Sequence, residues 1–518
     1  MTTYIVRLDG NDSNSGTVDS AAGAFLTPAK LISSLTQPGD IGLFGDGDWG
    51  GVIYSAIIAN GTQSNPITLK SKNKWGAKIK VIGTQGSGSG HNSPLTCALE
   101  IQADYWVIDG FEIDGSAGYS GNNWIGSGIE WGIGIYLTGS FSIAQNCKIH
   151  DLAKSTTATS NGGGGIVHEY YYESGNANGQ QSLNNTIYNI GTSLRNNTVH
   201  GIYIASPNSK AKGNTIYNCA SVGIQGWHKA DTLEYFNNVV FNCKQGLLIG
   251  SGSSGAVTGG IHNCRVANNI VVHCDTTGID EEGTIGSGNL YSNNLSWSNG
   301  TNWALISGTQ SNSLNVDPLF KNYQPDGSGD YSLTSNSPCI NAGIMSLGTS
   351  PTAYAPTIDS LGVVRPQGYT IDIGALELVV PAPSPTPTPT PAPTTSSPLN
   401  YPFGAIPIMS SQLGSNSVMT AKFPGSPGKT NYITSFEITG GGAQYAKIIY
   451  ATLSGIIGGS ASYIIGVKEG PNYLSEPLII KFPNDIPASA VNSDITLTVP
   501  AFGYGNVASA VVMHGYQL

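Results

Sequence analysis

The stretch "GNTIYNCASVGIQGW", residues Gly213 to Trp227, reads as two short strands that flank a turn of small residues. The same pattern returns in "NNVVFNCKQGLLIG" (Asn237 to Gly250) and in "NNIVVHCDTTGIDEEG" (Asn268 to Gly283). In each copy the residues after the asparagine are β-branched or aromatic and alternate in facing, as strands require. A unit that recurs at short intervals is typical of a chain built from stacked coils.

Two columns of residues run through the repeats. An asparagine column, with spacings of 39, 29, 24, 31 and 25 residues, consists of Asn146, Asn185, Asn214, Asn238, Asn269 and Asn294. A glycine column, in which each glycine is followed by Ile or Leu, consists of Gly132, Gly165, Gly201, Gly223, Gly246 and Gly278. Parallel strands stacked about 4.8 Å apart would bury each apolar residue on the next coil. We therefore predict an all-β chain whose main body is a parallel β-helix, with the asparagines bonded to backbone groups at its corners.

Motifs at both ends of this body resemble known β-helix proteins. "YIVRLDGNDSNSGT" (Tyr4 to Thr17) and "YWVIDGFEIDG" (Tyr105 to Gly115) are similar to the start and an early coil of right-handed parallel β-helix proteins of the pectate-lyase-like superfamily. "GDYSLTSNSPCINAG" (Gly329 to Gly343) and "DIGALE" (Asp372 to Glu377) resemble their C-terminal cap. The resemblance implies a right-handed helix with two caps over residues 1–380. It implies no single activity, because this scaffold carries lyases, hydrolases and adhesins alike.

A proline-rich segment separates this body from a second domain. "PAPSPTPTPTPAP" has seven prolines in thirteen residues, which predicts a semi-rigid polyproline II linker over residues 381–398. Residues 399–518 contain no cysteine and carry β-rich runs broken by Gly and Pro, which favour a small β-sandwich. The phrases "TNYITSFEITGGGA" and "VMHGYQL" resemble a C-terminal domain of tailed-phage virion proteins. That resemblance implies that this domain anchors the chain to a particle or makes it oligomerise.

Composition limits the classes of partner that the chain can bind and the compartment in which it is made. The formal net charge is −10, so the long-range field repels polyanions and argues against nucleic-acid binding. No apolar run reaches the roughly 20 residues of a membrane helix, and no basic-then-apolar leader opens the chain. We expect synthesis in the host cytoplasm without a signal peptide, followed by release on lysis. The seven cysteines form no CxxC or zinc spacing and are predicted to be free, buried thiols.

One face of the strands that begin at the glycine column is predicted to point to solvent. In a strand that starts Gly-Ile the isoleucine points inward, so the second and fourth residues after the glycine point outward. This places three aromatic rings and an amide in one stripe, at Tyr136, Tyr203, Gln225 and Trp227. Such side chains match the apolar faces and polar edges of sugar rings. The alternative interpretation is an ordinary strand surface made of β-forming residues.

Acidic residues of the same stripe are candidates for catalysis. Asp280 and Glu282 stand two apart on one strand, so their Cα atoms would lie about 6.6 Å apart at about 3.3 Å per residue. An inverting glycosidase pair is conceivable at that spacing. Glu169 is a third candidate, although it stands four coils away and cannot partner the other two. Together with Glu281, Asp280 and Glu282 are also weak candidates for binding a hard cation, or are simply a solvated surface.

Other chemistries find less support. Lyase chemistry of the pectate type needs calcium held by several Asp and a basic residue, and the predicted stripe contains neither Arg nor Lys. His168 is expected to point inward, His200 to belong to a turn, and His228 is a weak general-base candidate. The chain has no phosphate-binding glycine loop, HExxH or GxSxG motif. No cofactor is predicted.

Together these features predict a phage virion surface protein, either a capsid decoration or a spike or fibre, whose β-helix projects outward and binds host glycan. The expected partners are other virion proteins, contacted through residues 399–518, and a host surface polysaccharide. Further copies of the chain are also expected partners, with a homotrimer favoured. The main alternative is a tailspike-type depolymerase that uses Asp280, Glu282 or Glu169, more as a glycosidase than as a lyase. A bacterial surface adhesin is the third alternative.

Overall fold

The computed structural model describes the chain except for residues 51–52, 56–58, 82–95, 126–129, 156–161, 170–176, 192–197, 253–256, 350, 369, 380–401, 403, 415, 442–446, 468–477 and 504–507. The chain divides into two compact units, Met1–Ala382 and Pro383–Leu518. The predicted linker over residues 381–398 lies outside the described residues.

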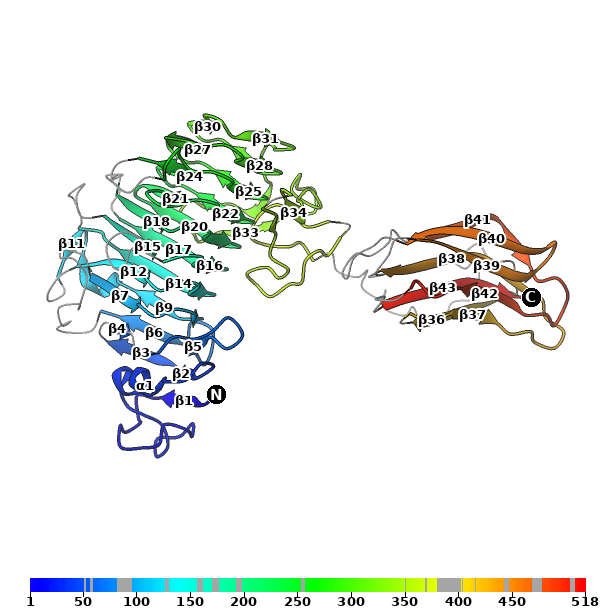
Figure 1. Cartoon of the computed structure of the whole chain (residues 1–518), viewed down its shortest axis with the longest axis horizontal. Helices are drawn as coiled ribbons and strands as arrows, with labels where there is room; N and C mark the ends of the chain where they lie inside the picture. The colour runs from blue at the N-terminus through cyan, green and yellow to red at the C-terminus, as the bar shows by residue number, and fades with distance from the viewer. Residues whose placement is uncertain are drawn as a thin grey trace, which may run out of the picture. The chain divides into compact units, whose positions relative to one another are not determined.

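The first unit is a parallel β-helix in which successive coils stack from β1 at one end to β30 and β31 at the other (Figure 1). Within the described ranges it has three long parallel sheets, here named A, B and C. Sheet A has eleven strands: β1 (Thr3–Val6), β2 (Ile41–Phe44), β5 (Ile67–Ser71), β8 (Trp106–Asp109), β13 (Ile143–Gln145), β16 (Gln181–Leu183), β19 (Lys210–Lys212), β22 (Glu234–Phe236), β25 (Arg265–Ala267), β28 (Leu290–Ser292) and β31 (Thr309–Ser311).

Sheets B and C have nine strands each in the described part of the chain. Sheet B comprises β3 (Gly47–Gly50), β6 (Ala77–Lys80), β9 (Glu112–Asp114), β14 (Lys148–Leu152), β17 (Thr186–Ile190), β20 (Thr215–Cys219), β23 (Val239–Phe241), β26 (Ile270–Val272) and β29 (Leu295–Trp297). Sheet C comprises β4 (Ile53–Ser55), β7 (Thr96–Ile101), β12 (Trp131–Leu137), β15 (Gly163–His168), β18 (Val199–Ile204), β21 (Val222–Gly226), β24 (Gln245–Ser251), β27 (Thr277–Gly283) and β30 (Thr301–Ala304).

Like residues stack on like residues inside the coils, so the predicted parallel β-helix is confirmed. Ile187 pairs with Ile216, Ile216 with Val240, and Val240 with Val271, and all four side chains are fully buried. Burying one such side chain stabilises the fold by about 1.5–3 kcal/mol, but only when the next coil is present to cover it. All seven cysteines are free and buried, as predicted.

A buried asparagine ladder joins the coils at the corner between sheets A and B. The Oδ1 atom of Asn214 accepts hydrogen bonds from the backbone N and the Nδ2 of Asn185, both at 3.0 Å. Asn238 accepts the equivalent bonds from Asn214 at 3.0 and 2.9 Å, and the ladder continues through Asn269 to Asn294. The predicted stacking of these asparagines is confirmed.

The first member of the predicted asparagine column is wrong by one residue. Cys147 occupies the ladder position, since its backbone N donates to Asn185 Oδ1 at 2.9 Å. Asn146 lies at the preceding corner residue with a left-handed φ of 55°, and its Nδ2 donates to Asp109 Oδ1 at 2.7 Å. Asparagine tolerates this conformation better than most residues, which is why the two positions look alike in sequence.

The first member of the predicted glycine column is also displaced. Ile133 pairs with Gly164 and Ile135 with Ile166, so Gly134 rather than Gly132 lies beside Gly165. A Cβ atom on Gly134 would lie 2.6 Å from the carbonyl oxygen of Gly165. Glycine is required here because the strand backbones approach too closely for any side chain.

A short helix lies at the N-terminal end of the coils. Helix α1 (Pro28–Ser34) begins at Thr27, whose Oγ1 accepts a hydrogen bond from the backbone N of Lys30 at 3.2 Å. Its Leu31 and Ile32 are buried in the core of the β-helix. Among the described residues, neither this helix nor any other has the length and apolar character needed to cross a membrane.

Residues 317–377, here called the lateral segment, pack along the side of the last coils rather than over their end. The segment contains β32 (Phe320–Asn322), β33 (Asp330–Leu333), β34 (Ser346–Leu347) and β35 (Ala353–Tyr354), and appears in yellow-green beside sheets A and B (Figure 1). Its Leu333 and Ile373 form one buried cluster with Phe241 and Val272 of sheet B. The outer face of sheet B is apolar in these coils, and the lateral segment buries it. The sequence resemblance of this segment to a C-terminal cap therefore corresponds to a side cover.

The second unit is a β-sandwich of two antiparallel sheets, which confirms the predicted fold class of this region. Four described strands form each sheet. One sheet has the order β36 (Ile406–Gly414), β43 (Ala508–Gln517), β38 (Asn431–Gly441), β41 (Leu478–Pro487), and the other β37 (Met419–Phe423), β42 (Ile495–Val499), β39 (Lys447–Ile456), β40 (Gly459–Val467). Their inner faces enclose one core that includes Phe423, Phe436 and Leu497.

The remaining described elements are a small hairpin and one turn of 3-10 helix at a corner of the β-helix. They are η1 (Ser116–Gly118), β10 (Tyr119–Ser120) and β11 (Asn123–Trp124).

Candidate functional site

Several of the predicted outward positions form one row on the outer face of sheet C, whereas Glu169, Trp227 and Glu282 lie two residues further along the chain. Strand pairing places in register Glu100, Tyr136, Val167, Tyr203, Gln225, Leu248 and Asp280. The row points away from the core, as predicted, but it is not a solvent-exposed stripe. Tyr136 is only 3% exposed, because it packs with Val167, Cys97 and Ile133 in a cluster of its own.

Other residues predicted to lie on the solvent side of sheet C, or in a turn beside it, are also involved in packing. Tyr203 is half-buried and stacks on His200, with ring centroids 5.1 Å apart. His200 lies in β18, not in the predicted turn, and burial lowers its pKa to about 3. Glu169 is only 3% exposed, against the prediction that it faces solvent.

His168 faces the core, as predicted. It is fully buried, its Nε2 lies 2.8 Å from Ser182 Oγ, and burial lowers its pKa to about 3. A neutral imidazole in this position is part of the packing between sheets A and C.

Asp280 and Glu282 come together at the side chain of Gln245. The Nε2 of Gln245 donates to Asp280 Oδ2 at 2.5 Å and to Glu282 Oε1 at 2.9 Å. Two oxygens at these distances from one nitrogen are at most about 5.4 Å apart, which is closer than the roughly 6.5–9.5 Å of an inverting pair and compatible with a retaining pair at roughly 5–5.5 Å. The two oxygens that meet at Gln245 are thus closer together than the inverting spacing conceived from the sequence.

The two carboxyl groups differ in environment. Asp280 is buried, at 6% exposure, whereas Glu282 is exposed. Burial, and next the charge of Glu282, raise the pKa of Asp280 to about 6. One carboxyl group therefore keeps its proton to a higher pH than an ordinary aspartate does.

Trp227 lies beside this pair. Gly250 pairs with Glu282 in the strand register, and a Cβ atom on Gly250 would lie 2.3 Å from Cζ3 of Trp227. The half-buried indole ring thus rests on the backbone of the coil next to Glu282. Gln225, also half-buried, lies in the outer row two residues before Trp227, and Leu248 separates it from Asp280. Of the predicted glycan-binding residues, Trp227 is the one beside the strand pair that carries Glu282.

Glu281 points the opposite way from its neighbours. It is 3% exposed and accepts hydrogen bonds from Tyr291 Oη at 2.9 Å and from the backbone N of Ile306 and Ser307, both at 2.8 Å. The three acids of "GIDEEG" therefore do not form one cation site, because strand alternation sends Glu281 inward. Its role is to hold the loop that follows β30.

Comparison with known proteins supports the fold. Residues 109–260 match the family described as "Right handed beta helix region". The chain contains a right-handed parallel β-helix.

Several solved structures are similar to this chain at low identity. A rhamnogalacturonan lyase is 13% identical, with 65% of this chain and 96% of that chain covered and a TM-score of 0.41. XylC in complex with xylose is 13% identical, with 61% and 70% covered and a TM-score of 0.40. The Dettilon tailspike protein is 12% identical, with 99% and 94% covered and a TM-score of 0.37. No curated protein matches the chain. Resemblance at this level carries no information about activity.

A charged cluster that the sequence did not predict lies on the outer face of sheet B. Glu112 lies between Lys148, at 2.7 Å, and Lys78, at 3.0 Å, and its Oε1 is 3.2 Å from His150 Nε2. Burial acts to raise the pKa of Glu112, but hydrogen bonds from Lys148, Lys78 and His150 lower it to about 2. The signal was present in "CKIHD", since Lys148 and His150 flank a core isoleucine and so share the outer face.

The same cluster contains a possible set of metal ligands. Asp114, His150 and Asp151 each offer an atom within 4.8 Å of the others. Asp151 is already paired with Lys154 at 2.7 Å, and His150 Nδ1 lies 2.8 Å from Asp151 Oδ2. Mutual pairing of the acids with lysines and histidine accounts for this cluster as an ion-pair network.

Proposed function

We propose that the protein is a virion surface protein whose β-helix binds a polysaccharide on the outer face of sheet C, and that Asp280 and Glu282 hydrolyse it. The observation that carries this proposal is that one amide, that of Gln245, donates to both carboxyl groups, of which Asp280 is buried with a pKa raised to about 6 and Glu282 is exposed. A glycosidase needs two neighbouring carboxyl groups in different protonation states at one pH.

The two groups suit different steps. Asp280, with a pKa of about 6, retains a proton to near-neutral pH and would donate it to the oxygen of the leaving sugar. Glu282 is exposed and would attack the anomeric carbon as a carboxylate. Because their bonded oxygens are so close, we expect net retention of anomeric configuration. Gln245 orients both groups, and Trp227 offers a ring edge for a neighbouring sugar.

Glycan binding without cleavage is a second candidate. It is favoured by the low exposure of Asp280 and by the hydrogen bonds from Gln245, which satisfy both carboxyl groups in the absence of substrate. Under this alternative, Trp227, Gln225 and the two acids would bind sugar hydroxyls only.

The decisive experiment measures new reducing ends when the purified chain is incubated with a panel of bacterial capsular and O-antigen polysaccharides. We expect cleavage that falls at least 100-fold in both Asp280→Asn and Glu282→Gln, and proton NMR of the first product should show retained configuration. Glu169→Gln is the matched control and should remain active. Binding of a polysaccharide without any release of reducing ends would favour the second candidate.

The virion location rests on the likeness of residues 399–518 to virion domains and on the proline-rich segment that precedes them. Other virion proteins and further copies of the chain are the proposed partners of the β-sandwich. Mass spectrometry of purified particles from a lysate should detect the chain at a fixed ratio to the capsid protein. Its absence from the particles would contradict the virion assignment and leave the glycan assignment intact.

A further inference from the structure

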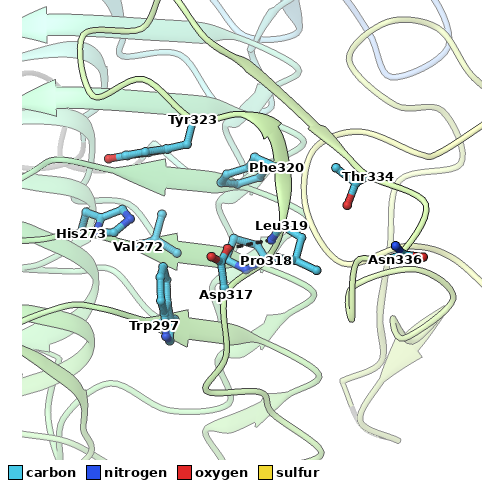
Figure 2. A pocket seen from close by; sticks show the side chains of 10 residues that line it. All are labelled: Val272, His273, Trp297, Asp317, Pro318, Leu319, Phe320, Tyr323, Thr334 and Asn336. Carbon is cyan, nitrogen blue, oxygen red and sulfur yellow. Dashed lines mark hydrogen bonds between the residues drawn. The ribbon is translucent and has the colours of Figure 1, made fainter.

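We propose that a cleft between sheet B and the lateral segment binds a neutral sugar ring, as a saccharide site separate from Asp280 and Glu282. The cleft has a volume of about 440 Å³, within the range of roughly 300–1,000 Å³ that is typical of small-molecule sites. Figure 2 shows Val272, His273 and Trp297 on the side of the coils, facing lateral-segment residues such as Phe320 and Tyr323.

Aromatic rings form much of the wall. His273 lies between Tyr323, with ring centroids 4.6 Å apart, and Trp297, at 5.3 Å. Phe320 and Tyr323 are nearly parallel, at 17° with centroids 6.4 Å apart. Trp297, Phe320 and Tyr323 are each half-buried, so part of every ring remains open to the cleft. A pyranose ring presents a flat face of C–H bonds, which packs well on such surfaces.

Polar groups at the edge of the cleft are not used within the protein. Among the described residues, no hydrogen bond is made by Trp297 Nε1, the Tyr323 hydroxyl, Thr334 Oγ1 or the Asn336 side-chain amide. Asp317 uses only its Oδ1, which accepts from the backbone N of Leu319 at 2.8 Å (Figure 2). These groups together offer several donors and acceptors around the rings, as the hydroxyl rim of a sugar requires.

The charge of the cleft selects against acidic sugars. Asp317 is the one carboxylate among the described lining residues, and none of them is Lys or Arg. Burial lowers the pKa of His273, so its ring is neutral at pH 7. A uronate or phosphate would therefore meet a negative group and no cation, whereas the hydroxyls of a neutral hexose could donate to Asp317.

The cleft lies on another sheet than the proposed hydrolytic pair, so the two proposals stand independently. Binding is to be measured by isothermal titration calorimetry of the full chain with gluco-, manno- and galacto-hexasaccharides and, in parallel, with oligogalacturonate. At least one neutral hexasaccharide should bind. Its Kd should rise about tenfold or more in Trp297→Leu and about three- to tenfold in Asn336→Ala, which removes one polar side chain from an exposed position.

One control separates this site from the rest of the chain. Trp303→Leu removes another half-buried tryptophan, on β30 of sheet C, and should leave the Kd unchanged. Asn336→Ala and Thr334→Val keep the test valid if Trp297→Leu does not fold. The proposal is overturned if no neutral hexasaccharide binds, if oligogalacturonate binds more tightly, or if these cleft variants bind as wild type does.

Discussion

The asparagine ladder makes a quantitative prediction about the stability of the β-helix. The side chain of Asn238 accepts two hydrogen bonds from Asn214, at 3.0 and 2.9 Å, and donates to Ala211 O and Asn269 Oδ1, both at 2.9 Å. Asn238→Ala removes all four bonds at a fully buried position. At about 0.5–1.5 kcal/mol per bond, the free energy of unfolding should fall by about 2–6 kcal/mol.

The matched control for this prediction is Asn146→Gly. Asn146 makes one side-chain bond, to Asp109, and glycine accepts its left-handed φ of 55° without strain. This variant should therefore lose only about 1 kcal/mol. Urea titration of the full chain, followed by tryptophan fluorescence, gives both values. If Asn238→Ala costs no more than Asn146→Gly, the ladder does not stabilise the stack in the way argued.

Three further variants, with Lys422→Met as a control, test the charges. The pKa of Asp280 is raised to about 6, so the folded protein still holds a proton that the unfolded chain loses above about pH 4. The free energy of unfolding should therefore fall as the pH rises from 4 to 6, and it should fall by less in Asp280→Asn than in wild type. The pKa of His168 is lowered to about 3, so stability should fall as the pH drops below about 6.5, and His168→Gln should flatten that fall. Arg365→Leu leaves the buried Glu377 without its partner at 3.3 Å and should cost about 3–5 kcal/mol, whereas Lys422→Met at an exposed ion pair should cost less than about 1 kcal/mol. Urea titrations at a series of pH values measure the free energy of unfolding of these variants. If that free energy depends on pH equally in wild type and in the Asp280 or His168 variant, the corresponding pH prediction is contradicted.

The repeat made the coil predictable from sequence because each turn obeys the same constraint. Asn214 and Asn238 recur in register since each must bond to the coil below it, and that need is local and periodic. The offset at Asn146 arose because asparagine suits two adjacent positions, the ladder and the left-handed corner, for different physical reasons. When a coil has asparagine at only one of these two adjacent positions, its sequence alone does not distinguish the ladder position from the left-handed corner position.

The exposure of the outer row could not be predicted in the same way. Alternation fixes which side of a strand a residue points to, and Tyr136 and Asp280 do point outward. Whether a side chain on that side meets water depends on what else covers it. Tyr136 is buried by Cys97 and Val167, which come from neighbouring coils. The charged cluster around Glu112 lies on strands of sheet B, outside the glycine column, so the outward positions of that column do not include it.

Covering segments and ion pairs occupy part of the outer surface of the β-helix. The lateral segment covers the apolar outer face of sheet B at Phe241 and Val272, and ion pairs occupy the earlier coils of that face at Glu112. Two described places leave side chains open to solvent: the edge of the cover, where rings from both sides are half-buried, and the last coils of sheet C, where Glu282 is exposed. In both places the stacked coils hold side chains at fixed spacing while leaving some of their polar atoms open to solvent. A β-helix needs its coils for stability, so binding sites arise where its covering stops.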